Sequence, residues 1–96
     1  GDSHPRVVRI GDYHVDIVPE GTLLVMRNKD VPGVIGRVGT VLGERGINIA
    51  EYHQARLERG GEALAAIAVD EDVDPDVRED LLALDEVISA VVVRLG

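Results

Sequence analysis

The chain contains no cysteine, tryptophan or phenylalanine, and its only aromatic residues are Tyr13 and Tyr52. The absence of cysteine excludes a disulfide framework and a thiol nucleophile, and it agrees with a reducing cytoplasm. The scarcity of aromatic residues predicts an aliphatic core of valine, isoleucine, leucine and alanine. Such a core is thin, because a domain near this size buries only about 60% of its unfolded surface. We therefore expect additional burial in a homodimer.

Positive charge is also scarce, with 10 lysine and arginine residues against 18 aspartate and glutamate residues and a formal net charge of -8. A surface of this sign repels phosphate backbones and anionic lipids, so we expect neither nucleic acid nor a membrane as a partner. No apolar run reaches about 18 residues, and the sequence does not begin with a signal-peptide pattern. We expect one soluble, cytoplasmic domain.

The N-terminal part of the chain predicts a β-hairpin that stands apart from the rest. Short runs rich in β-branched residues at 6–10 and 13–18 are joined by a glycine and an aspartate, a pair that suits a tight hairpin turn. Residues 19–21 then break the pattern. We interpret residues 1–21 as a hairpin extension that ends a preceding domain.

The next part of the sequence predicts a strand, a helix and a second strand. The apolar run at residues 23–26 indicates the first of these strands. Apolar residues at helical spacing from Val34 to Leu42 indicate the helix, and Gly46 is a suitable left-handed end for it. Residues 47–57 form the next extended run.

The last part of the sequence predicts a strand, a helix and a final strand. The sequence RGGE at 59–62 signals a turn, after which small and branched residues continue at 63–69. Asp74 and Pro75 supply an N-cap and a first-turn proline for the second helix, and residues 87–95 form the last strand. The apolar positions of that helix are Val77, Leu81 and Leu84. The βαββαβ order predicts an α+β, ferredoxin-like fold, with a four-stranded antiparallel sheet and both helices on one face.

The most informative motif is DVPGVIG at residues 30–36, where a strand passes through a tight turn into a helix. Pro32 fixes φ, and Gly33 lets a ligand approach the first helical N–H groups, which suit a carboxylate. Asp30 places an acidic side chain beside this anion-accepting backbone. The pairing fits an amino acid, although an aspartate before a proline turn is often only a turn former or a helix cap.

Other motifs do not predict catalysis or metal binding. Gly33, Gly36 and Gly39 lack both the dinucleotide fingerprint and the lysine of a phosphate loop, so we predict that Gly36 and Gly39 allow close helix contacts. The aspartates within 70–76 superficially resemble a calcium loop, but Pro75 stands where such a loop needs glycine. The histidines show no metal-ligand spacing, and no nucleophile pattern is present. We expect a chain without catalytic residues, metal or cofactor.

Residues 30–36, together with GINIA at 46–50, resemble the signature of the ACT domain family. The resemblance spans residues 23–95, and we place the domain at 22–96. The flanking runs RVVRIG and VDIVPEG resemble the end of the intervening domain in D-3-phosphoglycerate dehydrogenases. The chain is therefore similar to the C-terminal regulatory domain of that NAD-dependent family of serine biosynthesis, which implies a sensor rather than a catalyst.

The resemblance also implies a ligand and a partner. ACT domains of that family pair side by side into one continuous sheet and bind L-serine at the interface as a feedback inhibitor. By position, the implied ligand-binding residues are Asn28, Asp30, Gly33, Val34, Ile35 and Asn48. The asparagine at position 28 departs from the histidine or tyrosine common there. Two alternatives remain open: a structural dimerisation module, or an ACT sensor of another amino acid.

Overall fold

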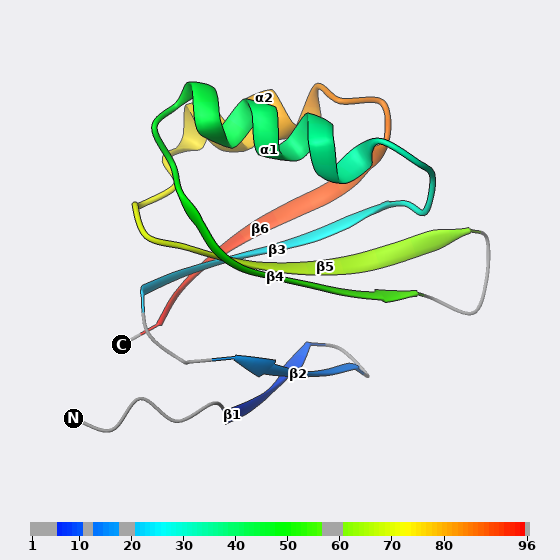
Figure 1. Cartoon of the computed structure of the whole chain (residues 1–96), viewed down its shortest axis with the longest axis vertical. Helices are drawn as coiled ribbons and strands as arrows, with labels where there is room; N and C mark the ends of the chain where they lie inside the picture. The colour runs from blue at the N-terminus through cyan, green and yellow to red at the C-terminus, as the bar shows by residue number, and fades with distance from the viewer. Residues whose placement is uncertain (1–5, 11–12, 18–20, 57–60, 96) are drawn as a thin grey trace.

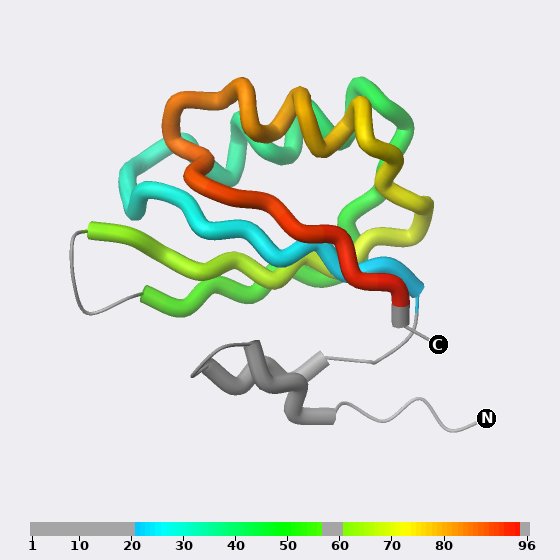
Figure 2. Tube along the Cα trace, turned by 180° about the vertical axis from the view of Figure 1, so that it is seen from behind, coloured from blue at the N-terminus to red at the C-terminus, as the bar shows by residue number. Residues whose placement is uncertain are grey.

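Two helices cover one face of a four-stranded antiparallel sheet in the computed structural model, which describes residues 6–10, 13–17, 21–56 and 61–95 (Figure 1). The elements are β1 (Arg6–Ile10), β2 (Tyr13–Ile17), β3 (Gly21–Lys29), α1 (Val34–Glu44), β4 (Ile49–Arg56), β5 (Glu62–Val69), α2 (Pro75–Leu82) and β6 (Val87–Leu95). The sheet order is β4-β5-β3-β6, so β4 and β6 are the edge strands. Figure 2 shows from behind that α1 and α2 lie on the same side of the sheet. The predicted ferredoxin-like fold is confirmed.

Strands β1 and β2 form a separate two-stranded sheet, as the hairpin prediction requires. Their antiparallel register pairs Arg6 with Ile17 and Ile10 with Tyr13. The predicted turn at residues 11–12 and the break at 19–20 lie outside the described residues. The assignment of residues 1–21 to a preceding domain stays a prediction.

The core between helices and sheet is aliphatic, as the scarcity of aromatic residues predicts. Side chains alternate between the two faces of a strand, so Leu24 and Met26 on β3 both point toward the helices. From α1, the residues Val34, Val38 and Leu42 are buried against them. Tyr52 packs at the margin of this core from the edge strand β4. The core therefore fixes how α1 lies over the sheet.

The predicted role of Gly36 and Gly39 in helix packing is wrong. Among the described residues, no atom lies within 4 Å of the place where a Cβ would stand at either position. The reason is how the helix is rotated about its own axis. Its valine and leucine stripe faces the core and makes the contacts of α1, whereas Gly36 is exposed and Gly39 half-buried. The predicted left-handed end of this helix is confirmed, because Gly46 has a φ of 72°.

Helix α2 begins as its sequence predicts. The Asp74 carboxylate accepts hydrogen bonds from two first-turn backbone N–H groups at 3.1 and 3.2 Å. Val77 and Leu81 are buried, but the helix ends at Leu82, so the prediction of Leu84 as a helical position is wrong. Leu84 still packs against the core from the following turn. Neither helix of the described ranges combines the length and the apolar character needed to cross a bilayer.

Candidate functional site

A pocket of about 360 Å³ lies where β3 and β4 end and α1 begins. Both strands run antiparallel to β5, which lies between them, so their C-terminal ends meet at the same end of the sheet. The pocket is lined by Asn28, Asp30, Val31, Pro32, Gly33, Val34, Ile35, Gly36, Gln54 and Arg56. The fold therefore brings together five of the six predicted ligand-binding residues, and it adds two from β4.

The start of α1 presents unsatisfied backbone N–H groups to this pocket. Gly33 has a φ of 91° and precedes the helix, and no described side chain caps the first turn. The first intrahelical bond runs from the Arg37 N–H to the Gly33 carbonyl at 3.0 Å. The N–H groups of Val34, Ile35 and Gly36 thus have no partner within the helix. They carry the partial positive charge of a helix N-terminus, which attracts a carboxylate.

Asn28 contributes a buried hydrogen-bond acceptor. Its side chain lines the pocket although the residue is only 1% exposed. The Nδ2 group donates to the Lys29 carbonyl at 2.9 Å, and since only the amide nitrogen can donate, this bond orients the side chain. The Oδ1 atom is buried and has no partner among the described residues. An unpaired buried acceptor costs about 1–3 kcal/mol, so a donor bound here stabilises the site.

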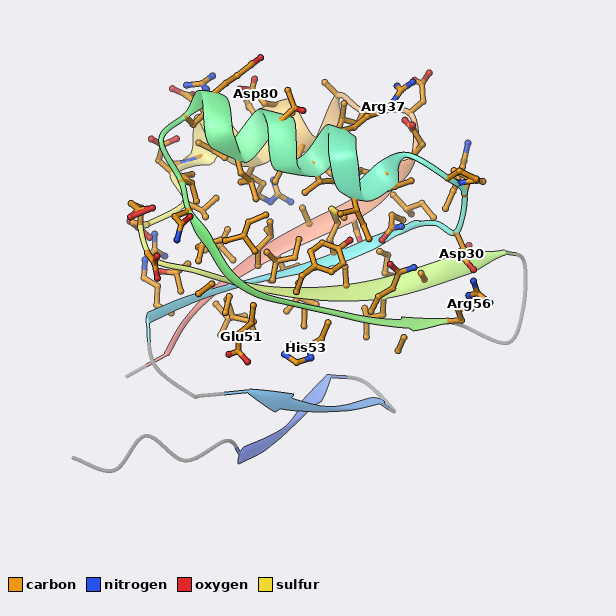
Figure 3. All side chains as sticks on the ribbon, viewed as in Figure 1. Asp30, Arg37, Glu51, His53, Arg56 and Asp80 are labelled. Atoms are coloured by element: carbon orange, nitrogen blue, oxygen red, sulfur yellow. The ribbon has the colours of Figure 1, made fainter. Side chains whose placement is uncertain are left out.

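Asp30 contributes the negative charge of the pocket. Its backbone N–H donates to the Gly61 carbonyl at 2.6 Å, which ties the loop to the start of β5. Its carboxylate lies 2.9 Å from Arg56 Nε, and Gln54 Nε2 lies 3.4 Å from the other oxygen. Figure 3 shows Asp30 and Arg56 facing each other at this end of the sheet.

Gln54 and Arg56 were not predicted from the sequence. Twenty-four residues separate Gln54 from Asp30, and no local motif links them. The topology does carry a signal. In a βαββαβ fold the strands before and after the first helix run parallel, so their C-terminal ends lie at the same end of the sheet. Side-chain alternation then places Gln54 and Arg56 on one face, which is the face that α1 covers.

Asn48 lies outside the pocket of its own chain. It follows α1 and precedes β4, so it stands at the opposite end of both elements from Asp30. Its Nδ2 group donates to Asp70 Oδ2 at 2.7 Å, and its backbone N–H donates to Glu71 Oε1 at 2.6 Å. A ligand contact from Asn48 therefore requires a second subunit.

The acidic loop after β5 has structural partners. Asp70 binds Asn48, Asp72 pairs with Arg94 at 3.0 Å, and Asp74 caps α2. The hydrogen bond and charge of Arg94 hold the pKa of Asp72 below its ordinary value. These three carboxylates thus serve separate contacts rather than one ligand.

The outer edge of β4, beside the pocket, carries backbone groups that point away from the sheet. On β6 the Ala90 carbonyl accepts a hydrogen bond from Arg78 Nε at 2.7 Å, so it points away from β3. Backbone groups alternate in direction along antiparallel strands. The register places Gln54 in line with Ala90 across β3 and β5. Because this direction reverses at each step across the sheet, the N–H and C=O of Gln54 point away from β5 and out of the sheet. Tyr52 and Arg56, two residues to either side, present theirs in the same direction.

The sequence around this pocket matches known proteins. The family model described as "ACT domain" matches residues 22–86. This chain belongs to the ACT domain family. Similar proteins include D-3-phosphoglycerate dehydrogenases of Archaeoglobus fulgidus, 40% identical over 92 residues, and of Bacillus subtilis, 34% identical over 90 residues, each match covering 94% of the chain. The enzyme of that name from Methanocaldococcus jannaschii is 34% identical over 98% of the chain.

The matched region is a small part of each relative. The chain spans only 17% to 18% of the length of these three dehydrogenases. The predicted resemblance to ACT domains of D-3-phosphoglycerate dehydrogenases is nevertheless confirmed, because both the family model and the relatives point to it.

Proposed function

We propose that this ACT domain binds a free amino acid, with L-serine as the leading candidate, and thereby regulates a D-3-phosphoglycerate dehydrogenase. The observation that carries the proposal is the buried, unpaired Oδ1 of Asn28 beside the Asp30 carboxylate and the uncapped start of α1. An amino acid brings one ammonium and one carboxylate. The ammonium suits Asp30 and Asn28, and the carboxylate suits the N–H groups of α1.

L-serine enters the proposal through the family resemblance and the names of the relatives. A small polar amino acid also suits a pocket of about 360 Å³ that is lined by an amide, a carboxylate and backbone N–H groups. A hydroxyl can donate to the Asn28 Oδ1 atom or accept from a neighbouring group. A branched apolar side chain has no hydroxyl to make such a hydrogen bond, so we expect weaker binding of valine, leucine and isoleucine.

The proposed site is completed by side-by-side dimerisation through β4. Two β4 strands that pair antiparallel across a two-fold axis bring the Asn48 end of one subunit toward the Arg56 end of the other. The outward backbone groups of Tyr52 and Gln54 make that pairing possible. Asn48 of the partner subunit would then reach the pocket that it cannot reach within its own chain.

Regulation follows if the ligand binds one arrangement of the two subunits better than another. In this proposal the present chain is a sensor without catalytic residues, and the dehydrogenase chemistry belongs to other parts of a longer protein. The ligand is a partner of the dimer interface, so its binding and dimerisation strengthen each other.

Calorimetric titration of the chain with L-serine, glycine, L-alanine, L-threonine and the branched amino acids tests the proposal. We expect L-serine to bind best and Asp30→Asn to weaken it by about 2 kcal/mol, roughly 30-fold, because a charge-assisted hydrogen bond is lost. The matched control is Asp72→Asn, which removes an arginine-paired aspartate far from the pocket. A dimer that binds none of these amino acids would contradict the proposal and favour a structural dimerisation module.

A further inference from the structure

The ion pair between Arg56 and Asp30 occupies the place that the proposed function gives to the ligand ammonium. The Arg56 Nε atom lies 2.9 Å from Asp30 Oδ2. A ligand ammonium that binds Asp30 must therefore share this carboxylate with the guanidinium or displace it. Displacement alone gains little, because it only replaces one ion pair on Asp30 with another and returns Arg56 to solvent.

A zwitterion resolves this conflict by replacing one ion pair with two. Its ammonium takes the place of the guanidinium on Asp30, and its carboxylate offers the released guanidinium a new partner. Arginine suits this exchange because its planar guanidinium binds carboxylates through two parallel hydrogen bonds. Resting on the amino-acid site proposed above, we infer that Arg56 is a ligand-binding residue that exchanges Asp30 for the carboxylate of the bound amino acid.

The surroundings of Arg56 permit this movement. Its side chain is 82% exposed, whereas that of Asp30 is 25% exposed, so the arginine is the partner with room to turn. Arg56 lines the same pocket as the uncapped start of α1. A ligand carboxylate between them receives backbone N–H groups on one side and the guanidinium on the other. Gln54 Nε2, at 3.4 Å from Asp30 Oδ1, stays available to Asp30 throughout.

This exchange restricts the ligand class to molecules that carry both charges close together. Ethanolamine has the ammonium and hydroxyl of L-serine but no carboxylate. It therefore competes with Arg56 for Asp30 without offering the guanidinium a new partner. 3-Hydroxypropionate has the carboxylate and hydroxyl but no ammonium, and it meets an Arg56 that Asp30 already neutralises. Both analogues should bind far more weakly than L-serine.

The test is calorimetric titration of the wild-type chain, Arg56→Gln and Arg56→Lys with L-serine, ethanolamine and 3-hydroxypropionate. We expect Arg56→Gln to weaken L-serine about tenfold or more, because a charge-assisted contact is lost. Ethanolamine should bind Arg56→Gln as well as or better than wild type, because its competitor for Asp30 is gone. Arg56→Lys should recover part of the L-serine affinity. The matched control is Arg45→Gln, which removes an arginine paired with Asp80 outside the pocket.

The outcomes separate this inference from the proposed function. If wild type binds L-serine and Arg56→Gln binds it equally well or more tightly, Arg56 is only a surface ion pair and the inference is wrong while the amino-acid site stands. Equal weakening of L-serine and ethanolamine by Arg56→Gln would also overturn it, because the effect would not involve the carboxylate. If wild type binds no amino acid, the proposed function fails and the inference fails with it.

Discussion

The two edge strands of the sheet differ in the hydrogen bonding of their outward backbone groups. On β6, Arg78 donates to the outward carbonyl of Ala90, and Arg94 near the end of the strand pairs with Asp72. On β4, no described residue donates to or accepts from the outward backbone groups of Gln54. The β6 edge is covered by a charged side chain, and we call the β4 edge open in the sense that none of the described residues bonds these Gln54 groups.

In the dimer proposed above, the difference favours β4 as the edge used for assembly. An exposed edge strand is a template for pairing with another chain, and charged side chains are a common way to prevent that. Arg78 therefore limits pairing at β6, while β4 keeps its hydrogen-bonding groups beside the ligand pocket. The same strand that supplies Gln54 and Arg56 to the pocket is also the strand available to a second subunit.

The largest expected effect is on the open edge. Gln54→Pro removes an outward N–H without removing a bond to β5, and proline is tolerated on the outer side of an edge strand. We expect the dimer to weaken by about 2 kcal/mol, roughly 30-fold, because two symmetry-related hydrogen bonds are lost. Sedimentation equilibrium measures the change, with circular dichroism to verify folding.

Two variants control this experiment. Gln54→Thr keeps the N–H and should remain as dimeric as wild type. His53→Pro removes an N–H that points toward β5, so it should destabilise the fold itself. An unchanged dimer in Gln54→Pro would mean that the subunits associate through another surface.

The second effect concerns the covered edge. Arg78→Ala exposes the Ala90 carbonyl and removes its hydrogen bond, so we expect a loss of about 1 kcal/mol in the free energy of unfolding. We also expect association beyond the dimer, measured by light scattering at increasing protein concentration. Arg78→Lys retains a charged donor and is the control. If Arg78→Ala associates no further than wild type, Arg78 does not block pairing at β6.

The smallest effect concerns Tyr52, which joins the open edge to the core. Burial raises the pKa of its hydroxyl above the ordinary 10.0. The folded state therefore holds the proton more tightly than the unfolded state, so stability is complete below that pH and falls as the pH rises above it. Because the buried Tyr52 hydroxyl has no partner among the described residues, Tyr52→Phe should raise the free energy of unfolding at neutral pH, by up to about 1 kcal/mol.

Urea unfolding at neutral pH and at about pH 11 measures this difference. Wild type should lose stability relative to Tyr52→Phe at the higher pH. A clear destabilisation of Tyr52→Phe at neutral pH would instead reveal a partner for the hydroxyl, and a second subunit at the β4 edge would then be the first candidate.

Local patterns predicted most of the fold. The apolar stripe from Val34 to Leu42 and the cap at Asp74 are short-range signals, and their physical causes act within one or two turns of helix. The prediction for the glycines of α1 fails because it concerned contacts between different elements. Spacing alone could not tell that Gly36 faces open space, because that depends on how α1 is rotated over the sheet.

The residues of the candidate site also differ in how well the sequence predicts them. Asn28, Asp30 and the loop before α1 are close in sequence, and the fold keeps them together. Arg56 comes from a distant strand and becomes visible only when the strand order is known. Asn48 was predicted with the pocket residues, yet the length of α1 separates it from them in the same chain. The sequence pattern alone carries no information about which residues a second subunit would contribute.

The glycines of α1 have a consequence for how the domain could respond to a ligand. Gly36, Gly39 and Gly43 have open space around them, so no packing requirement within the described part of the chain explains them. Each glycine in a helix interior lowers helix stability by about 0.5–1 kcal/mol relative to alanine. Helix α1 is therefore intrinsically weak and depends on its three buried residues and on what binds its first turn. We expect its amide protons to exchange fastest among the core elements and to slow when the pocket is filled, which would make the order of this helix itself the quantity that the ligand controls.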